Sequence, residues 1–206
     1  WRALVLKKMS EAAKATNATV VAGFADITPN EKRNIALTFP PDGGAPVTYV
    51  KRKLVPGLED GFAAGTGPLV LKNGIGIEIC KDMDFEQMLR ADSALHPRVL
   101  AVPAWDFEED AYGHARVAIM RGIENGVAVA RSARRGLLTL TDPYGRLVNR
   151  RASMSDATMT LVGDLPVGEG AGHTLYARVG DVFAWFSLLI GAGFLALAFA
   201  KRAKPA

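Results

Sequence analysis

The residue best suited to do chemistry is Cys80, the one cysteine among 206 residues. It follows an apolar run at 74–79 that is typical of a strand, and residues 85–95 have the pattern of a helix. This order predicts a thiol on a tight turn at the carboxyl end of a strand, near a helix N-terminus. Free backbone N–H groups and the helix dipole favour a thiolate there and can bind an oxyanion. Cys80 is therefore the candidate nucleophile, and inert packing is the alternative for a lone cysteine.

Strand and helix patterns alternate along the rest of the chain. Before the cysteine, strand-like runs fall at 19–24, 34–39, 47–53, 68–72 and 74–79. After it they fall at 99–103, 127–132, 136–141, 146–149 and 158–162, with a helix pattern at 111–125. Residues 40–44 read PPDGG, which predicts a hairpin between the second and third runs. Strands mixed with helices in this order predict an α/β layered domain with a mixed sheet.

The composition limits the class of protein. A hydrophobic share of 49% and a net charge of +4 are ordinary for one packed domain with a small appendage. The basic residues are dispersed, so we expect no nucleic-acid partner. One cysteine excludes an internal disulfide, and His96, His114 and His173 lack the paired spacing of metal ligands. We expect neither a metal nor another cofactor.

A long apolar stretch lies near the C-terminal end. Residues 182–200 read VFAWFSLLIGAGFLALAFA, without a charge, and match the roughly 20 residues that a helix needs to cross a bilayer. Trp185 suits the headgroup region, and a basic cluster follows at 201–204. The positive-inside rule places this cluster in the cytoplasm and the preceding domain outside, which in a Gram-negative cell is the periplasm. The alternative is a buried core helix of a soluble domain.

Five short motifs, in a fixed order, resemble those of one enzyme superfamily. Residues 49–59 read YVKRKLVPGLE, and residues 79–82 read ICKD. Further along are AWD at 104–106, RGIE at 121–124 and TLYARVGD at 174–181. These blocks resemble the nitrilase (carbon–nitrogen hydrolase) superfamily, and most closely its apolipoprotein N-acyltransferase branch. The resemblance extends over nearly the whole chain.

The resemblance implies an αββα nitrilase-type sandwich, truncated at its N-terminus, with a Glu–Lys–Cys triad. Cys80 would attack a carbonyl carbon and form a thioester. Lys51 would stabilise the thiolate and the tetrahedral oxyanion, aided by the backbone N–H of Lys81. Independently of any family, an ammonium group beside a thiol lowers the pKa of that thiol. The alternative for Lys51 is a solvated position in a run of basic residues at 51–53.

The same resemblance implies three further site residues. Glu59 matches the family's second, loop-borne glutamate, which assists the lysine; its alternative is a surface charge. Asp82 stands where the family has a carboxylate two residues after the cysteine, or it only caps the following helix. Trp105 matches an aromatic residue that lines the acyl pocket, or it is plain packing.

The general-base glutamate of the family's triad has no match in this sequence. In the family it follows a strand that precedes the first helix, and here the sequence starts at Trp1 within an amphipathic helix pattern. We therefore expect a C-terminal part of a longer protein that is inactive alone. Its expected organisation is a partial hydrolase domain at 1–178 and a membrane helix with a basic cytoplasmic tail at 179–206.

The motifs also depart from the family at several positions. Lys53 replaces a histidine, Lys81 replaces an aromatic residue beside the nucleophile, and Arg134 replaces an asparagine. These changes indicate a divergent member with an altered pocket.

Three functions are consistent with these features. The first is acyl transfer from a phospholipid to the N-terminal amine of a lipoprotein, at the bacterial inner membrane. The second is hydrolysis of a small amide or nitrile by a membrane-anchored amidase or nitrilase, which the departures favour. The third is a non-catalytic domain that keeps the fold for binding or assembly. The presence of both Lys51 and Cys80 argues against this third function. A homo-oligomer would also fit the family, whose members often pair through this sandwich.

Overall fold

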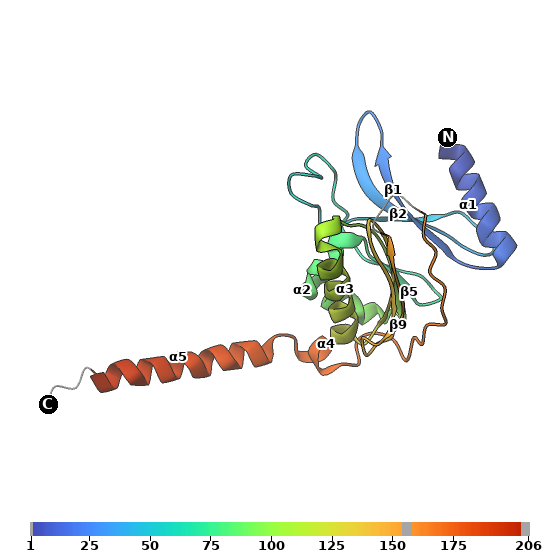
Figure 1. Ribbon diagram of the computed structural model, residues 1–206. Coiled ribbons are helices and arrows are strands. Elements are labelled where there is room, and N and C mark those ends of the chain that lie inside the picture. Colours follow the sequence, from blue (N-terminus) through green and yellow to red (C-terminus); the bar gives the residue numbers. More distant parts are fainter. Residues whose placement is uncertain (1, 154–157, 203–206) are drawn as a thin grey trace.

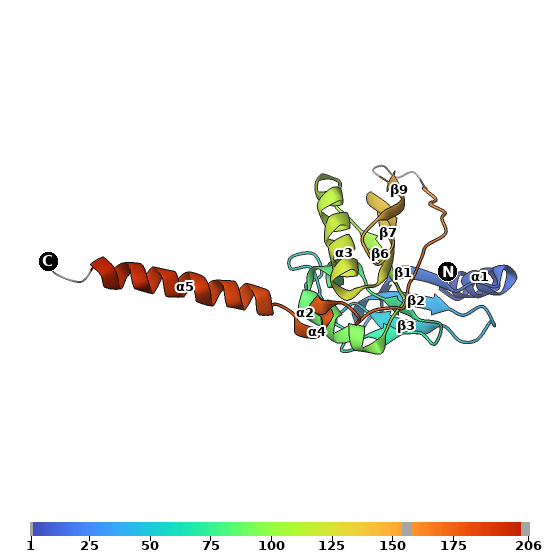
Figure 2. The same ribbon diagram turned by 90° about the horizontal axis from the view of Figure 1, so that it is seen from below.

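The computed structural model describes residues 2–153 and 158–202 (Figure 1). Within them, four layers lie on one another: one helix, a three-stranded sheet, a six-stranded sheet and a pair of helices (Figures 1 and 2). This order of layers is the expected αββα sandwich.

The three-stranded sheet is antiparallel and consists of β1 (Val20–Ile27), β2 (Lys32–Phe39) and β3 (Val47–Val50). Alternate β2 residues, among them Ile35 and Phe39, form a buried cluster with Ala13 of α1 (Arg2–Thr16). On the opposite face, Tyr49 of β3 packs in a cluster with Ile77 of the second sheet. The antiparallel pairing of β2 and β3 confirms the predicted hairpin, although β3 ends at Val50 rather than at residue 53.

The six-stranded sheet is mixed, as expected. In spatial order it contains β4 (Leu69–Val70), β5 (Ile75–Ile77), β6 (Val99–Trp105), β7 (Ala128–Arg134), β8 (Gly136–Thr141) and β9 (Leu147–Ser153). The three central strands β5, β6 and β7 are parallel, while β4, β8 and β9 pair antiparallel with their neighbours. The carboxyl ends of the parallel strands therefore meet at one edge, where the chain after β5 carries Cys80.

Two helices cover the outer face of this sheet. They are α2 (Glu86–Asp92) and α3 (Ala111–Asn125), and a short 3-10 helix, η1 (Cys80–Asp84), precedes α2. Leu89 of α2 and Ala118 of α3 share a buried cluster with Leu100 and Val102 of β6 and with Val129 of β7. This cluster is the largest of the buried clusters among the described residues, and it fixes the helices against the parallel strands.

One predicted strand is wrong. Residues 158–162 have a strand-like apolar pattern but form no strand. Side chains of β9 hold this segment instead: the Asn149 amide donates to Val162 O over 2.8 Å, and Arg151 donates to Thr160 O over 3.2 Å. The segment is thus bound to β9 by side-chain hydrogen bonds and does not pair with it as a β-strand.

After residue 162 the chain crosses the domain and ends in two helices, α4 (Leu175–Val179) and α5 (Val182–Arg202). Ala171 N donates to Pro97 O over 2.7 Å, and Gly172 N donates to Asn125 O over 2.9 Å. These bonds tie the segment to the ends of β6 and α3. The α5 helix then extends away from the domain (Figures 1 and 2).

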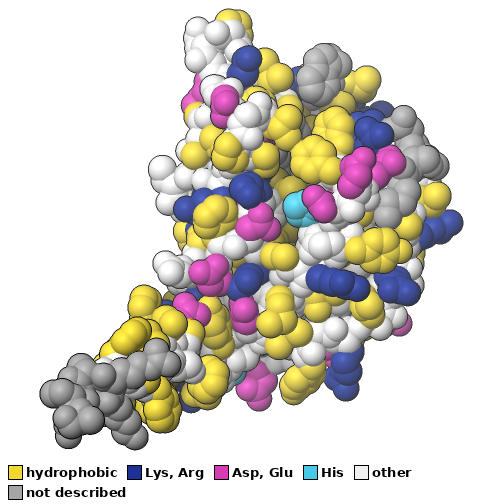
Figure 3. All heavy atoms as spheres, turned by 60° about the vertical axis from the view of Figure 1, so that its left-hand side comes forward, with side chains coloured by type: hydrophobic (Ala, Val, Ile, Leu, Met, Phe, Trp, Pro, Cys, Tyr) yellow, Lys and Arg dark blue, Asp and Glu magenta, His cyan; other side chains and the backbone are white. Residues whose placement is uncertain are grey.

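The α5 helix matches the predicted apolar segment. Among the described residues it is the one helix long and apolar enough to cross a membrane, and residues Val182–Phe199 are not buried in the protein. The part of it seen in Figure 3 carries mostly hydrophobic side chains, whereas charged and apolar groups mix over the domain face in that view. A buried core helix is therefore excluded as its explanation.

Candidate active site

Cys80 lies on a strained turn three residues after the end of β5. Its φ angle is +45°, in the left-handed region that non-glycine residues rarely adopt. Its Sγ atom lies 3.8 Å from the carbonyl oxygen of Trp105, at the end of the neighbouring strand β6. Strained backbone of this kind often marks a functional position. Cys80 is itself the first residue of the five-residue η1. The helix predicted over residues 85–95 is present as α2, from Glu86 to Asp92, followed by a 3-10 turn at Ser93–Leu95.

Lys51 follows β3 directly and is buried, with only 2% of its surface exposed. Its backbone N–H donates to Asn34 O over 2.9 Å, which continues the pairing with β2. The backbone of Gly65 packs against the backbone of Lys51, because Gly65 N donates to Lys51 O over 2.9 Å. The solvated surface position considered for Lys51 is therefore wrong.

Glu59 is the direct partner of Lys51. The Lys51 ammonium donates to Glu59 Oε2 over 2.6 Å, and the Asn34 amide donates to Oε1 over 2.6 Å. The backbone N–H of Val55 also donates to Oε2, over 2.7 Å. Burial alone would raise the pKa of Glu59, but the hydrogen bonds from Asn34, Lys51 and Val55 outweigh it and lower this pKa. Glu59 is thus a stable carboxylate that holds Lys51, not a surface charge.

The electrostatics of Cys80 differ from the sequence-based expectation. Burial raises the pKa of the Cys80 thiol, and the nearby charge of Lys51 lowers it without overcoming the effect of burial. The carboxylate of Asp106 raises it further. Of the charges that act on the sulfur, Lys51 is thus the one that most favours the thiolate. In the described residues, however, the thiol requires a base before it can attack.

Asp82 joins the two segments that carry Lys51 and Cys80. Its carboxylate is fully buried and accepts the Ile79 N–H over 3.0 Å, which closes the turn around Cys80. It also accepts the N–H groups of Arg52 and Lys53, over 3.1 and 2.7 Å, immediately after Lys51. Its role is therefore to bridge two strand ends, not to cap α2.

A buried polar network lies behind this bridge. The Tyr49 hydroxyl oxygen lies 2.9 Å from both Asp82 Oδ2 and Glu78 Oε2, and it accepts a hydrogen bond from Arg52 Nε over 3.0 Å. Arg52 also pairs with Glu78, over 2.8 Å, and with Asp92 of α2. Sequence reasoning missed Tyr49, Arg52, Glu78 and Asp92 as parts of the site region. The available signal was Glu78 itself, a charged residue inside an apolar strand pattern.

The other predicted site residues lie around the thiol. Trp105 is 60% exposed, and the Arg134 guanidinium stacks over its ring at 4.6 Å. The side chain of Lys81 points to Asp84, over 3.2 Å, which leaves only its backbone near the sulfur. Trp105 thus faces solvent, whereas the Lys81 side chain is partly buried and lies near Asp84 and the Phe85 ring.

Below Trp105, a buried ion pair fixes the end of β6. The Asp106 carboxylate accepts two hydrogen bonds from the Arg131 guanidinium of β7, at 2.9 and 2.5 Å. A side chain at Gly136 would collide with this carboxylate, because its Cβ would lie 2.0 Å from Asp106 Oδ2. The pair orients the end of β6, which carries the Trp105 carbonyl.

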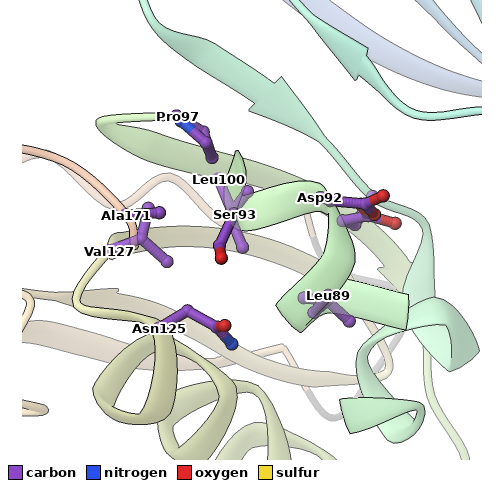
Figure 4. Close-up of a pocket in the computed structure, with 9 residues that line it drawn as sticks. Leu89, Asp92, Ser93, Pro97, Leu100, Asn125, Val127 and Ala171 are labelled. Atoms are coloured by element: carbon purple, nitrogen blue, oxygen red, sulfur yellow. The ribbon is translucent and has the colours of Figure 1, made fainter. Parts of the chain in front are cut away.

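A small cavity of about 10 Å³ lies on the helix side of the six-stranded sheet (Figure 4). Its lining includes Glu78, Asp92, Ser93 and Asn125. Cys80 and Lys51 do not line it, and the volume is at the lower limit for one water molecule. The cavity therefore belongs to the buried network and is not a substrate pocket.

The sequence matches the family model described as carbon-nitrogen hydrolase over residues 2–172. It is also similar to a protein named apolipoprotein N-acyltransferase from Geobacter metallireducens, at 32% identity over 157 residues. That alignment covers 73% of this chain and 29% of the relative, so the chain spans less than a third of that protein's length. The chain belongs to the carbon–nitrogen hydrolase family.

Solved structures show the same fold. An amidase from Nesterenkonia sp. AN1 superposes with a TM-score of 0.63 at 20% identity, over 71% of this chain and 64% of the amidase. A carbon-nitrogen hydrolase from Helicobacter pylori G27 gives 0.61 at 16% identity, over 71% of this chain and 62% of that one. The fold and the family are those that the motifs predicted.

Proposed function

We propose that the protein is a membrane-anchored enzyme of the carbon–nitrogen hydrolase family that works through a thioester on Cys80. Its proposed reaction is the transfer of an acyl chain from a phospholipid to the N-terminal amine of a lipoprotein. The observation that carries this proposal is the buried ammonium of Lys51, held by Glu59 and acting on the sulfur of Cys80. The similarity to an apolipoprotein N-acyltransferase supports the choice of reaction.

In the proposed first step, the Cys80 sulfur attacks the ester carbonyl carbon of the phospholipid. Lys51 and the backbone N–H of Lys81 stabilise the oxyanion that forms. The C–O bond then breaks, the leaving alcohol takes a proton and departs as a lysophospholipid, and the acyl group remains on sulfur. In the second step the acceptor amine attacks the thioester, loses a proton and regenerates the thiol.

The proton of the Cys80 thiol requires a base in this scheme. Both oxygens of Glu59 are engaged by Asn34, Lys51 and Val55 N. We therefore assign Glu59 to positioning Lys51 and place the general-base glutamate upstream of Trp1. In this proposal residues 1–206 alone do not turn over, and measurable turnover by them would overturn this assignment.

We further propose that α5 crosses the bacterial inner membrane, with the domain in the periplasm and the basic tail in the cytoplasm. The length, apolar surface and lack of burial of α5 support the span. The basic residues that follow it support the orientation. A phospholipid would then meet the domain at the membrane surface.

The second candidate is hydrolysis of a small amide or nitrile, with water as the acceptor. The amidase folds among the structural neighbours and the replacements at Lys53, Lys81 and Arg134 favour it. A non-catalytic binding domain is the third candidate, and the buried, partnered Lys51 beside Cys80 speaks against it.

The experiment that separates the first two candidates supplies the complete gene product with both kinds of substrate. Membranes that contain the protein receive phospholipid with a labelled acyl chain and a diacylated lipopeptide, or a panel of small amides. Transfer predicts label on the lipopeptide amine that disappears in Cys80→Ser. Release of ammonia from amides without labelled lipopeptide would contradict acyl transfer and favour the hydrolase.

A further inference from the structure

In the buried network behind the active-site turn, the Tyr49 hydroxyl contacts two carboxyl groups, although it has a proton to donate to only one of them. The Tyr49 hydroxyl has one proton, yet its oxygen lies 2.9 Å from carboxylate oxygens of both Glu78 and Asp82. The same oxygen already accepts a hydrogen bond from Arg52 Nε. Two ionised carboxylates cannot both accept from one hydroxyl proton, so one of the two carboxyl groups must itself donate.

The surroundings identify which carboxyl group carries the extra proton. Asp82 accepts three backbone N–H groups, which stabilise a negative charge. Glu78 has one other donor, Arg52, and this guanidinium is shared with Asp92 of α2. Glu78 is 2% exposed, where an ionised carboxylate is costly.

We propose that Glu78 is a neutral carboxylic acid that donates to Tyr49 and thereby acts as a positioning residue for the active site. Tyr49 then donates its own proton to Asp82. Asp82 in turn holds the Ile79–Cys80 turn on one side and the backbone after Lys51 on the other. The chain of donors thus sets the separation of the ammonium and the sulfur.

The charged and titratable groups that face Glu78 are consistent with this assignment. They are Tyr49 and Arg52 from the end of β3, Asp82 from η1 and Asp92 from α2. Burial raises the pKa of Glu78, the positive charge of Arg52 lowers it, and the negative charges of Asp82 and Asp92 raise it further. Together they raise this pKa to about 8. Burial raises the pKa of Asp82 as well, but the backbone N–H donors of Ile79 and Lys53 oppose that rise. The geometry therefore places the proton on Glu78.

The test uses Cys80 as its own reporter, because a chain with one cysteine is alkylated by iodoacetamide at one site. The measured quantity is the factor by which Lys51→Met slows alkylation at pH 7, in the 206-residue chain in detergent. It is compared in four backgrounds: wild type, Glu78→Gln, Glu78→Leu and Tyr49→Phe. This readout rests on the proposed pairing of Lys51 with Cys80 but needs no acyl transfer, so it stands or falls separately from the proposed reaction.

In wild type, loss of the ammonium is expected to slow alkylation about tenfold, equivalent to one pKa unit. Glu78→Gln should keep this factor, because the amide donates to Tyr49 and accepts from Arg52 as the acid does. Glu78→Leu and Tyr49→Phe should shrink it to about threefold or less, because the sulfur and the ammonium are no longer held together. Tyr49→Phe removes only a hydroxyl and carries the test if the Leu chain does not fold.

Two results would overturn the proposal. A Gln background that loses the Lys51 effect as the Leu background does would show that Glu78 must be ionised. Full retention of the effect in both Tyr49→Phe and Glu78→Leu would show that the network does not position the pair.

Discussion

At the scale of single residues, the site combines one strong ion pair with one unactivated thiol. Lys51 is buried and bound to Glu59 over 2.6 Å, so its ammonium is fixed in direction before any substrate arrives. Such preorganised charge is effective because it requires no rearrangement when the oxyanion forms. The thiol, in contrast, has a pKa raised by burial. We infer that the site separates oxyanion stabilisation from proton removal.

Glu59→Gln tests the first of these roles. The neutral amide cannot balance the ammonium of Lys51, so the ammonium should lose its fixed position, and acylation of Cys80 by an activated ester should slow about tenfold or more. Asp60→Asn is the matched control, because Asp60 is exposed and accepts a hydrogen bond from the backbone N–H of Gly57. Equal rates in both variants would contradict a positioning role for Glu59.

The raised pKa of Glu78 predicts a specific dependence of stability on pH. Between an unfolded value near 4.5 and a folded value of about 8, the unfolded chain releases the proton while the folded chain keeps it. The contribution of this group to stability is therefore complete below pH 4.5 and is lost as the pH rises to 8, at about 1.4 kcal/mol per pH unit. Denaturant unfolding of wild type and Glu78→Gln measures it. As the pH rises across this range, the unfolding free energy of the wild type should fall relative to that of Glu78→Gln. A constant difference between the two unfolding free energies would contradict the prediction.

At the scale of elements, the site depends on where β3 and β5 end. Backbone pairing places Lys51 opposite Asn34. Gly65 packs directly over Val50, the last residue of β3. A Cβ at Gly65 would lie 2.1 Å from Val50 O. This loop crossing therefore requires a residue without a side chain and helps to hold the end of β3.

Gly65→Ala tests this crossing. The collision is with backbone, which cannot move aside cheaply, so we expect a loss of unfolding free energy of about 2 kcal/mol or more. Gly67→Ala is the matched control: no atom lies within 4 Å of its Cβ position, and its effect should stay within about 0.5 kcal/mol. Similar stabilities of the two variants in denaturant unfolding would contradict the close contact.

Sequence patterns and motifs predicted the fold and the succession of strands along the chain up to β9. They also named Lys51, Glu59 and Cys80, whose catalytic roles stay predictions. They did not predict the buried network, because Arg52 and Asp92 lie 40 residues apart and meet only when α2 packs. The pKa of the thiol was also out of reach, since its direction depends on burial outweighing Lys51. Residues 158–162 show a further limit, because an apolar pattern does not tell whether a segment forms backbone hydrogen bonds with a neighbouring strand.

At the scale of the whole molecule, the domain and α5 differ in the surface they present. The domain buries its apolar residues between four layers, whereas α5 exposes apolar side chains along its length. The chain between them is bound to the domain at Pro97 and Asn125. An exposed apolar helix of this length fits the proposed span of a bilayer.

Removal of α5 tests the proposed membrane anchor. Residues 1–180 alone should leave the membrane fraction on washing with alkaline carbonate, because α5 is the one described helix long and apolar enough to span a bilayer. The full 206-residue chain should stay in the pellet and float with vesicles. Recovery of the full chain in the supernatant would contradict the span.

Acylation of Cys80 is measured by intact-protein mass spectrometry. The complete gene product is incubated with phospholipid of defined acyl chains and then analysed without reducing agent. We expect a mass increase of one acyl chain, located on Cys80, sensitive to hydroxylamine, absent in Cys80→Ser and greatly reduced in Lys51→Met. An unmodified Cys80 in a protein that nevertheless transfers acyl chains would contradict this expectation.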